Sequence, residues 1–478
     1  MVHDDGERRN SKEMQDTEEP PKGGALPSGR IARTAKFGKL VGGQSIRWAG
    51  TRAANVTRDD EQAERKMEQR ALKLADELVT QLGQMRGAAM KIGQVLSTID
   101  FDAIPEGERE AFKAKLASIR DSAPPVPFSK MKKVIEKDLG GKLSDHFAEF
   151  DENAFAAASI GQVHRGVTHD GDDIVVKIQY PGVAEAVETD MRNMNVLLPL
   201  LKRLAPGLDG KALLGELRER IGEEHDYEIE AQNQRRVERA FRDHPFIKVP
   251  KVFTDLSARR VLVSEFVEGQ GFEDVKQLPE SDRDRYGEIV FRFFMASLHR
   301  ERFCSGDPHP GNYLRCADGS VCFLDFGLMR QVSEPTLKAE HRLAAAVGSD
   351  DADTVKDVLT QLGYLPKPDD FEPEMLMAQM LAAGEWAFEP GFRRITPDYV
   401  RELTEVGSSP RSPFFKQMRQ MTLPPEALLV RRMEALIFSV LGELRAGGDW
   451  HALGLEFWGG AEPGTELGRI DAEWRAAS

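Results

Sequence analysis

The sequence of 478 residues contains only three cysteines, Cys304, Cys316 and Cys322. An odd number of cysteines in one short stretch excludes a disulfide framework and indicates a reducing compartment. The sequence also lacks any run of about 18 uninterrupted apolar residues, so we expect no transmembrane helix. Residues 1–29 are polar and have no apolar signal-peptide segment, and we expect them to form a disordered tail of a cytoplasmic protein.

Basic residues are too few to balance the acidic ones, because 65 Lys and Arg face 79 Asp and Glu, a net charge of −14. This balance argues against a dedicated nucleic-acid-binding protein, since phosphate binding needs concentrated positive charge. Hydrophobic residues nonetheless make up 40% of the chain, which excludes a wholly disordered protein. At about 150 residues per domain, the length suggests two or three domain-sized units.

One segment departs from the acidic average. Residues 30–58 contain seven basic and no acidic residues, interleaved with apolar ones such as Phe37 and Trp48. A basic amphipathic segment can lie on an anionic membrane surface, which would make the protein peripheral at the inner face of the membrane. The alternative, which we favour slightly, is a basic helix docked on the acidic body of the protein.

The order of predicted elements indicates an α+β fold. Residues 60–97 and 106–119 are expected to be helical, and residues 161–168 and 174–179 to be strands joined by a turn. A charged helix is predicted over 213–242 and strands over 248–253 and 260–266. After Glu268–Gly269 the pattern is helical, except for a hairpin of 313–316 and 320–324, with proline-marked breaks near 365–373, 397, 409–413 and 424–425. Strands followed by helices in this order are typical of a protein-kinase-like bilobal fold, with a small β-rich N-lobe and a helical C-lobe.

Two motifs near the predicted hairpin carry chemistry. Asp307 is followed five residues later by Asn312, which is the spacing of a kinase catalytic loop. The sequence Asp325-Phe326-Gly327 follows the hairpin. In this arrangement Asp307 orients the attacking hydroxyl or water, while Asn312 and Asp325 supply oxygen ligands to a metal ion such as Mg²⁺.

Upstream, a single lysine interrupts an apolar strand at Val175-Val176-Lys177-Ile178. Such a lysine can direct its ammonium group at the phosphates of a nucleotide. The charged helix that follows can supply its carboxylate partner, and the candidates are Glu224, Asp226 and Glu230. Glu265 and Val267, just before the predicted hinge, are also assigned to the nucleotide site.

The turn before Lys177 lacks the expected glycine-rich phosphate loop and contains Ala156, Ala157, Ala158 and Ser159 instead. Alanine restricts the backbone more than glycine does, so this segment should hold nucleotide differently from a typical protein kinase.

Together these motifs and Lys91-Ile92-Gly93-Gln94 resemble the UbiB / AarF-domain-containing (ADCK) family of atypical kinases, most closely its coenzyme Q-biosynthesis members. The resemblance extends over most of the chain. One departure is Ser305-Gly306 before Asp307, where many members have His-Ala.

The resemblance implies a kinase-like fold with an N-terminal helical extension that covers the active site. The expected organisation is a tail of 1–29, an extension of 30–149, an N-lobe of 150–268 and a C-lobe of 269–478. Lys91 and Gln94 would point into the nucleotide site as occluding or regulatory residues, with Lys91 paired to Glu224 or Asp226. Glu230 would then pair with Lys177, although the spacing also allows Glu224.

The resemblance further implies binding of ATP or ADP with Mg²⁺ and slow ATP hydrolysis, stimulated by lipid or small phenolic molecules. Expected partners are anionic membrane lipid and a quinone-precursor-like small molecule, with a homodimer left open. The role would be support of ubiquinone or related isoprenoid-quinone metabolism. The rival interpretation is a non-catalytic nucleotide-binding scaffold for quinone-biosynthesis partners. Protein kinase activity is not expected, because no Ala-Pro-Glu-like motif follows Gly327.

Overall fold

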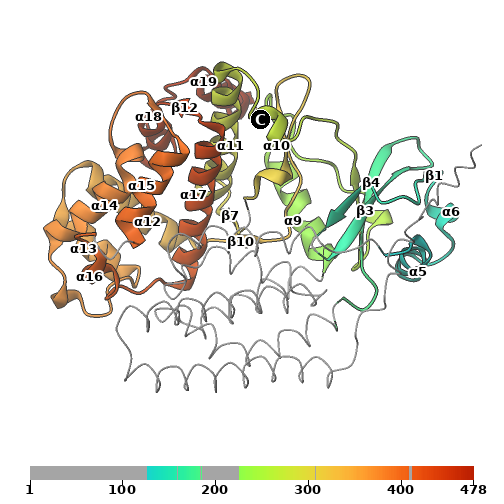
Figure 1. Ribbon diagram of the computed structural model, residues 1–478, viewed down its shortest axis with the longest axis horizontal. Helices are drawn as coiled ribbons and strands as arrows, with labels where there is room; N and C mark the ends of the chain where they lie inside the picture. Colours follow the sequence, from blue (N-terminus) through green and yellow to red (C-terminus); the bar gives the residue numbers. More distant parts are fainter. Residues whose placement is uncertain are drawn as a thin grey trace, which may run out of the picture. The chain divides into compact units, whose positions relative to one another are not determined.

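The computed structural model describes residues 126–158, 160–183, 185, 226–306, 308–408 and 412–477 (Figure 1). The chain divides into two compact units, one of Met1–Lys130 with Gly182–Leu208 and the other of Met131–Pro181 with Asp209–Ser478. The elements below belong to the second unit, apart from the start of the first helix. The helices predicted over 60–97 and 106–119, the basic segment 30–58 and the 213–225 part of the predicted charged helix lie outside the described residues. None of the helices that can be described is both long and apolar enough to cross a membrane.

The N-lobe is built on a five-stranded antiparallel sheet with the order β1-β3-β4-β6, in which β2 also pairs with β3. Its strands are β1 (Glu149–Phe150), β2 (Ala156–Ala158), β3 (Gly161–Val167), β4 (Asp173–Gln179) and β6 (Val261–Glu265). The predicted strands at 161–168, 174–179 and 260–266 are confirmed to within a residue at each end. The turn between β3 and β4 closes through the N–H of Thr168, which donates to the carbonyl of Asp172 at 3.0 Å.

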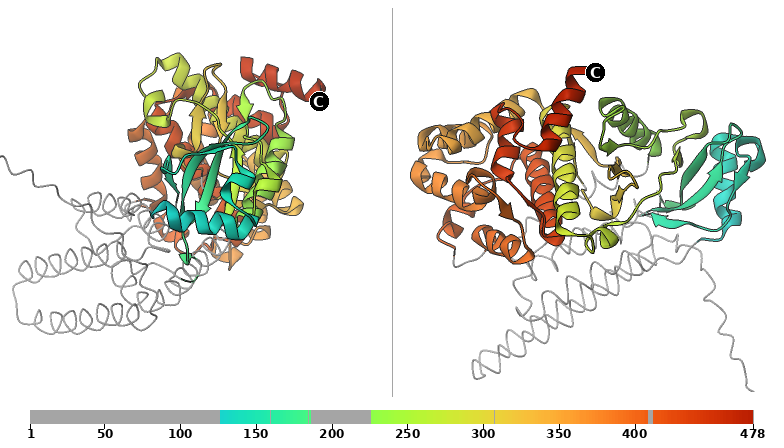
Figure 2. Two further views of the ribbon diagram at one scale, coloured as in Figure 1. Left: turned by 90° about the vertical axis from the view of Figure 1, so that its right-hand side faces the viewer. Right: turned by 90° about the horizontal axis from the view of Figure 1, so that it is seen from above.

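Alternating burial gives the sheet two different faces. Ile174, Val176 and Ile178 of β4 are fully buried, whereas Val175 and Lys177 between them are only partly buried. Helix α5 (Phe128–Leu139) also presents apolar residues at helical spacing, with Met131 and Ile135 fully buried, and Figure 2 shows it crossing the sheet.

The residues just before β1 are packed with the sheet in the same compact unit. Helix α5 is tied to the sheet by an ion pair between Asp138 and Arg260, the residue before β6. The short helix α6 (Leu143–His146) and strand β1 follow, and β1 pairs with β3. Residues 131–149 thus share a unit with the kinase-like lobes.

Helix α9 (Tyr227–Ala240) links the two lobes. Its last turns contribute Val237, and the residue after it, Phe241, joins the same hydrophobic core as the C-lobe helix α11. The short strand β5 (Ile247–Lys248) pairs in parallel with β9 of the C-lobe. The predicted strand at 248–253 is wrong beyond Lys248, because Pro250 cannot donate to a ladder and Val252 makes only an isolated bridge to Ser264. The single turn η2 (Thr254–Leu256) leads into β6.

The C-lobe is organised around helix α11 (Glu280–His299), most of whose residues are buried. The short helix α10 (Phe272–Val275) precedes it, and the small strands of this lobe follow it. These are β7 (Phe303–Ser305), β8 (Tyr313–Arg315), β9 (Val321–Phe323) and β10 (Met329–Gln331), with the turn η3 (Pro310–Asn312). The predicted hairpin is confirmed as β8 and β9, joined by a turn with Gly319 at a φ of 79°.

The rest of the chain is helical, as predicted, apart from the two-residue pair β11 (Arg393–Arg394) and β12 (Gly447–Gly448). Three helices start at the predicted prolines 373, 397 and 425, where the missing N–H costs nothing. The elements are α12 (Glu334–Gly348), α13 (Ala352–Gln361), η4 (Pro368–Asp370), α14 (Pro373–Phe388), α15 (Pro397–Ser408), α16 (Phe415–Met418), α17 (Pro425–Leu444), α18 (Trp450–Gly454), η5 (Leu455–Gly459) and α19 (Glu466–Ala477).

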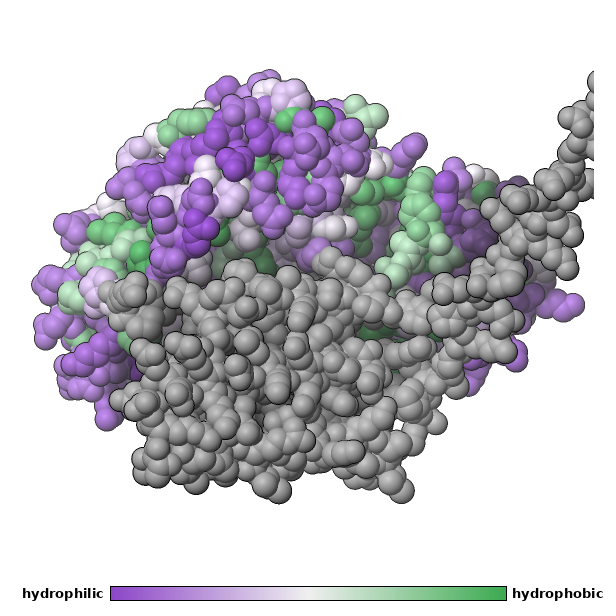
Figure 3. Space-filling model, in the orientation of Figure 1, coloured by the Kyte–Doolittle hydropathy of each residue, from purple (hydrophilic) through white to green (hydrophobic). Residues whose placement is uncertain are grey.

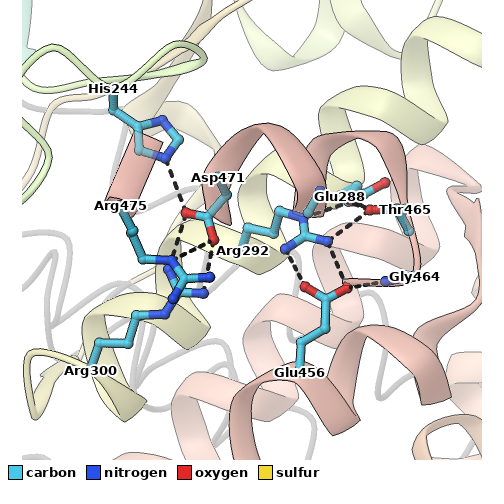
Figure 4. A network of polar contacts seen from close by, with 10 residues as sticks. His244, Glu288, Arg292, Arg300, Glu456, Gly464, Thr465, Asp471 and Arg475 are labelled. Carbon is cyan, nitrogen blue, oxygen red and sulfur yellow. Dashed lines mark hydrogen bonds and ion pairs between the residues drawn. The ribbon is translucent and has the colours of Figure 1, made fainter. Parts of the chain in front are cut away.

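A buried polar network fastens the C-terminal helix α19 to this lobe (Figure 4). Asp471 of α19 accepts hydrogen bonds from both terminal nitrogens of Arg300, at 3.0 and 2.9 Å, and contacts His244 at 3.3 Å. Arg292 of α11 is almost fully buried and pairs with Glu288 and Glu456, each at 2.7 Å. In the view of Figure 3, the coloured part of the surface is by contrast mostly hydrophilic, with scattered apolar patches.

Candidate active site

Lys177 and Glu230 form an ion pair at the junction of the sheet and α9. The Nζ atom of Lys177 donates to both carboxylate oxygens of Glu230, at 2.8 and 2.9 Å. Glu230 lies in the first turn of α9 and is only 5% exposed. Of the partners that the sequence left open for Lys177, the structure therefore pairs it with Glu230. Glu224 lies outside the described residues.

The charged form of the Lys177 side chain is stabilised although the group is partly buried. Burial alone would lower its pKa, but the carboxylates of Glu230 and Asp325 and the side chain of Tyr227 more than offset this, and the pKa is raised well above its ordinary value of 10.5. The ammonium group also lies 5.0 Å from the centre of the Tyr227 ring. Lys177 is therefore a fixed positive charge at neutral pH.

The motif Asp325-Phe326-Gly327 is held by its neighbours on both sides. Phe326 is 1% exposed and belongs to the C-lobe core, and its carbonyl accepts a hydrogen bond from the side chain of Asn233 at 3.0 Å. The carboxylate of Asp325 accepts the backbone N–H of Gly327 at 2.9 Å. The core residue thus anchors the motif while Asp325 stays at the surface of the site.

Asn312 lies next to Asp325, as the motif spacing predicts. Its side-chain nitrogen is 3.4 Å from Oδ2 of Asp325, and its carbonyl accepts the N–H of Leu324 at 3.0 Å. The hairpin of β8 and β9 produces this proximity, since Asn312 directly precedes one strand and Leu324 directly follows the other. An amide and a carboxylate are consequently presented side by side.

Gly327 marks the point where the two halves of the site meet. A Cβ atom on this residue would lie 3.4 Å from Oδ1 of Asp325 and 3.6 Å from Oε2 of Glu230. Carboxylates from α9 and from the end of the β8–β9 hairpin therefore flank the same small volume. The missing side chain leaves this space open.

The segment around the predicted catalytic Asp307 is also ordered by pairing, although Asp307 itself lies outside the described residues. Ser305 of β7 pairs with Met329 of β10, and the N–H of Gly306 donates to the carbonyl of Leu328 at 2.6 Å. On the other side, Nδ1 of His309 accepts the N–H of Gly311 at 3.0 Å. His309 therefore shapes this loop.

The alanine-rich segment forms a short strand where a phosphate loop was expected. Ala156, Ala157 and Ala158 make up β2, paired with Val163, Gln162 and Gly161 of β3. Gly161 is required at the turn, because a Cβ atom there would lie 2.1 Å from the carbonyl oxygen of Ile178. Ser159 lies outside the described residues.

The other predicted site residues have different surroundings. Asp226 is the N-cap of α9, accepting the N–H of Glu228 at 3.0 Å, and lies 3.6 Å from Arg259. Glu265 is exposed at the end of β6 and accepts the N–H of Lys251 at 3.2 Å. Val267 is partly buried just beyond it. The predicted contacts of Lys91 and Gln94 lie outside the described residues.

Two residues of the site were not predicted from the sequence. Tyr227 contacts the ammonium group of Lys177, and Asn233 holds the carbonyl of Phe326. Asn233 follows Glu230 by three residues, so the two share a face of α9. That spacing is the signal that could have identified Asn233 once Glu230 was chosen.

Comparisons with known proteins point to one family. The model of the ABC1 atypical kinase-like domain matches residues 118–359. The zebrafish (Danio rerio) mitochondrial atypical kinase COQ8B is 32% identical over 88% of this chain and 67% of its own. The mitochondrial atypical kinase COQ8 of Saccharomyces cerevisiae is 28% identical over 75% of this chain and 70% of its own.

A solved structure is similar as well. A Mycobacterium tuberculosis protein, determined in complex with erythromycin, is 31% identical, with a TM-score of 0.59 over 80% of this chain and 95% of the other. The family match, the relatives and the fold all lead to one assignment. This chain belongs to the ABC1 family of atypical kinases, with a protein-kinase-like bilobal fold.

Proposed function

We propose that this protein binds ATP with Mg²⁺ at the site of Lys177, Asn312 and Asp325 and slowly hydrolyses it or transfers its terminal phosphoryl group to a small molecule. The observation that supports this most strongly is the meeting of the Lys177–Glu230 ion pair and the Asn312–Asp325 pair around Gly327. Phosphoryl transfer in kinases uses such a set of groups, with a cation that binds phosphate and a carboxylate and an amide that bind the metal ion.

The side chains present fit a magnesium ion. Asp325 and Asn312 offer oxygen ligands next to each other, which suits a hard cation that takes the rest of its ligands from water and phosphate. Among the described residues there is no cluster of three or more His, Cys, Asp or Glu that would form a closed protein cage. When bound, the ion would neutralise charge on the phosphate oxygens.

Three residues of the protein would bind the phosphates, orient the groups and accept the proton. Lys177 would bind phosphate oxygens, while Glu230 fixes the direction of its ammonium group. Asp307, the acid expected from the sequence, would orient the attacking hydroxyl or water and accept its proton. The exposed alanine strand β2 supplies fewer free N–H groups than a glycine loop, which is consistent with slow turnover.

The setting we propose is isoprenoid-quinone metabolism at a membrane surface. Relatives of this chain are named as mitochondrial atypical kinases of the COQ8 type. The basic segment 30–58 would supply contact with anionic lipid, which would stimulate hydrolysis.

ATP hydrolysis by the purified protein with Mg²⁺, with and without anionic liposomes, tests this proposal. Asp325→Asn should lower the rate at least about a hundredfold, because a charge needed in the transition state is lost. Asp369→Asn, at an exposed carboxylate of η4, is the matched control and should leave the rate unchanged. No hydrolysis by either the native protein or the variants, with nucleotide binding intact, would contradict the enzyme proposal and favour the scaffold alternative.

A further inference from the structure

A second concave site lies within the C-lobe helices. Residues of α11, α12, α14 and α17 surround a cavity of about 670 Å³. Its wall is mostly apolar and aromatic, with Phe291, Trp386 and Phe438 among the lining side chains. Of the residues that the structure describes, none lines both this cavity and the candidate active site. Leu423, which is 49% exposed, and the exposed Ala435 also line it, so the cavity opens to the surface of the described part of the chain.

Charged side chains of the cavity wall gather around Arg431. Its guanidinium group forms ion pairs with Glu340 and with Glu434, the latter at 2.6 Å, and donates to the hydroxyl of Tyr364 at 3.2 Å. All four residues line the cavity. A largely apolar wall with a few grouped polar side chains is the usual composition of a small-molecule site.

Two polar atoms in this region lack partners among the described residues. Oε1 of Glu340 and Nε2 of His299 are both buried without a hydrogen bond. The other ring nitrogen of His299, Nδ1, lies 2.8 Å from Nε2 of His341. This contact fixes the orientation of the ring. Buried polar groups are nearly always paired in native proteins, so these two atoms at the cavity wall are positioned to interact with a polar group that enters the cavity.

The charge of the region disfavours an anionic ligand. Burial, together with His341, Arg431 and Arg300 nearby, lowers the pKa of His299 to about 3, so the ring is neutral at pH 7. Burial also raises the pKa of Glu434, against the opposing effect of Arg431. An anionic head group would face two glutamates around one arginine, whereas a hydroxyl can both donate to a carboxylate oxygen and accept from a ring N–H.

We propose that this cavity binds a small apolar molecule carrying a hydroxyl group, with its hydrocarbon body between α12, α14 and α17 and its hydroxyl near Glu340 and His299. The volume suits such a ligand, because small-molecule sites span about 300–1,000 Å³. The site does not depend on the proposed phosphoryl-transfer function.

Tryptophan fluorescence gives a direct test, since Trp386 and Trp458 both line the cavity. Decanol, decanoate and decylamine would be titrated separately into the full-length protein. We expect saturable quenching or enhancement with decanol, and binding of decanoate weaker by at least about tenfold, or about 1.4 kcal/mol. Equal binding of decanol and decanoate, or binding of decylamine as tight as that of decanol, would contradict the assignment of a hydroxyl ligand.

Two variants fill the cavity from different helices, Ala344→Phe on α12 and Ala435→Phe on α17. Both should weaken decanol binding by about tenfold or more. Ala345→Phe, at the exposed neighbour of Ala344 that does not line the cavity, should bind decanol normally. Circular dichroism would verify that each variant is folded. A decanol response that both filling variants retain, or no saturable response in the native protein, would overturn the proposal.

Discussion

At the scale of single residues, the sequence identifies candidate site residues more readily than it predicts which of them pair. Lys177 could be identified because one cation interrupts an apolar strand, and Asp325 because its motif is specific. Glu230 was favoured as the partner of Lys177 by the family resemblance, but spacing alone could not exclude Glu224, because the partner depends on where α9 lies against the sheet. The exposed fraction of Glu230, 5%, is a property of the folded protein alone.

The ion pair between Lys177 and Glu230 should affect nucleotide affinity. Glu230→Gln keeps the size of the side chain but removes the charge that balances Lys177. We expect nucleotide affinity to fall by about tenfold, because the freed ammonium group no longer has a fixed direction. Titration with a fluorescent ATP analogue in the presence of Mg²⁺ would measure the change.

Glu228→Gln is the matched control, since Glu228 lies in the same helical turn but is exposed. It should bind the analogue as the native protein does. If Glu230→Gln also bound normally, Lys177 would not depend on this carboxylate for its role.

At the scale of elements, local patterns predict the fold where each element satisfies its own hydrogen bonds. The β3–β4 and β8–β9 hairpins follow from alternating residues and turn signals, and the helices after Glu334 from their periodicity and prolines. The predicted strand at 248–253 fails because its two ends pair with different lobes and Pro250 between them cannot donate to a ladder. Lys248 pairs with the C-lobe, whereas Val252 bridges to the N-lobe sheet.

The polar network that attaches α19 should contribute to the stability of the protein. Asp471→Asn removes the charge that Arg300 and Arg475 share, while it leaves the shape of the side chain in place (Figure 4). We expect a loss of about 2–3 kcal/mol in the free energy of unfolding, because charged partners then lie in a mostly buried network without their counter-ion. Urea denaturation followed by circular dichroism would measure it.

Glu473→Gln changes an exposed carboxylate two residues away on the same helix and should have almost no effect. An unchanged denaturation midpoint for Asp471→Asn would mean that packing of α19, rather than this network, holds the helix.

At the scale of the whole molecule, segments that precede the C-lobe in the sequence contribute to its core. Helix α9 joins this core through Val237, and β5 does so through Ile247 and its pairing with β9. Composition and proline content predict the breaks between elements. They do not predict which hydrophobic core a segment joins, because that depends on contacts between residues far apart in the sequence.

Buried histidines predict how the stability of the whole protein responds to pH. The pKa of His299 is about 3 in the folded protein, and burial also lowers the pKa values of His164 and His244. Between pH 6.5 and 3 the unfolded chain binds more protons, so stability is full above pH 6.5 and is lost as the pH falls. His299 alone should cost about 1.4 kcal/mol per pH unit in this window.

Urea denaturation at a series of pH values would show this slope. His299→Leu should make it shallower by the contribution of about one proton. His169→Leu, at an exposed residue of the β3–β4 turn, should leave it unchanged. A slope that is the same in both variants would show that His299 is not the group responsible.

The course of α9 has a mechanical consequence. One end of the helix holds Glu230 against the sheet, and the other end is embedded among C-lobe side chains through Val237 and Phe241. Because α9 contacts both lobes, any change in their relative position must either move α9 within the C-lobe core or lengthen the 2.8 Å contact between Lys177 and Glu230. A distance probe placed across this contact would report such a change directly.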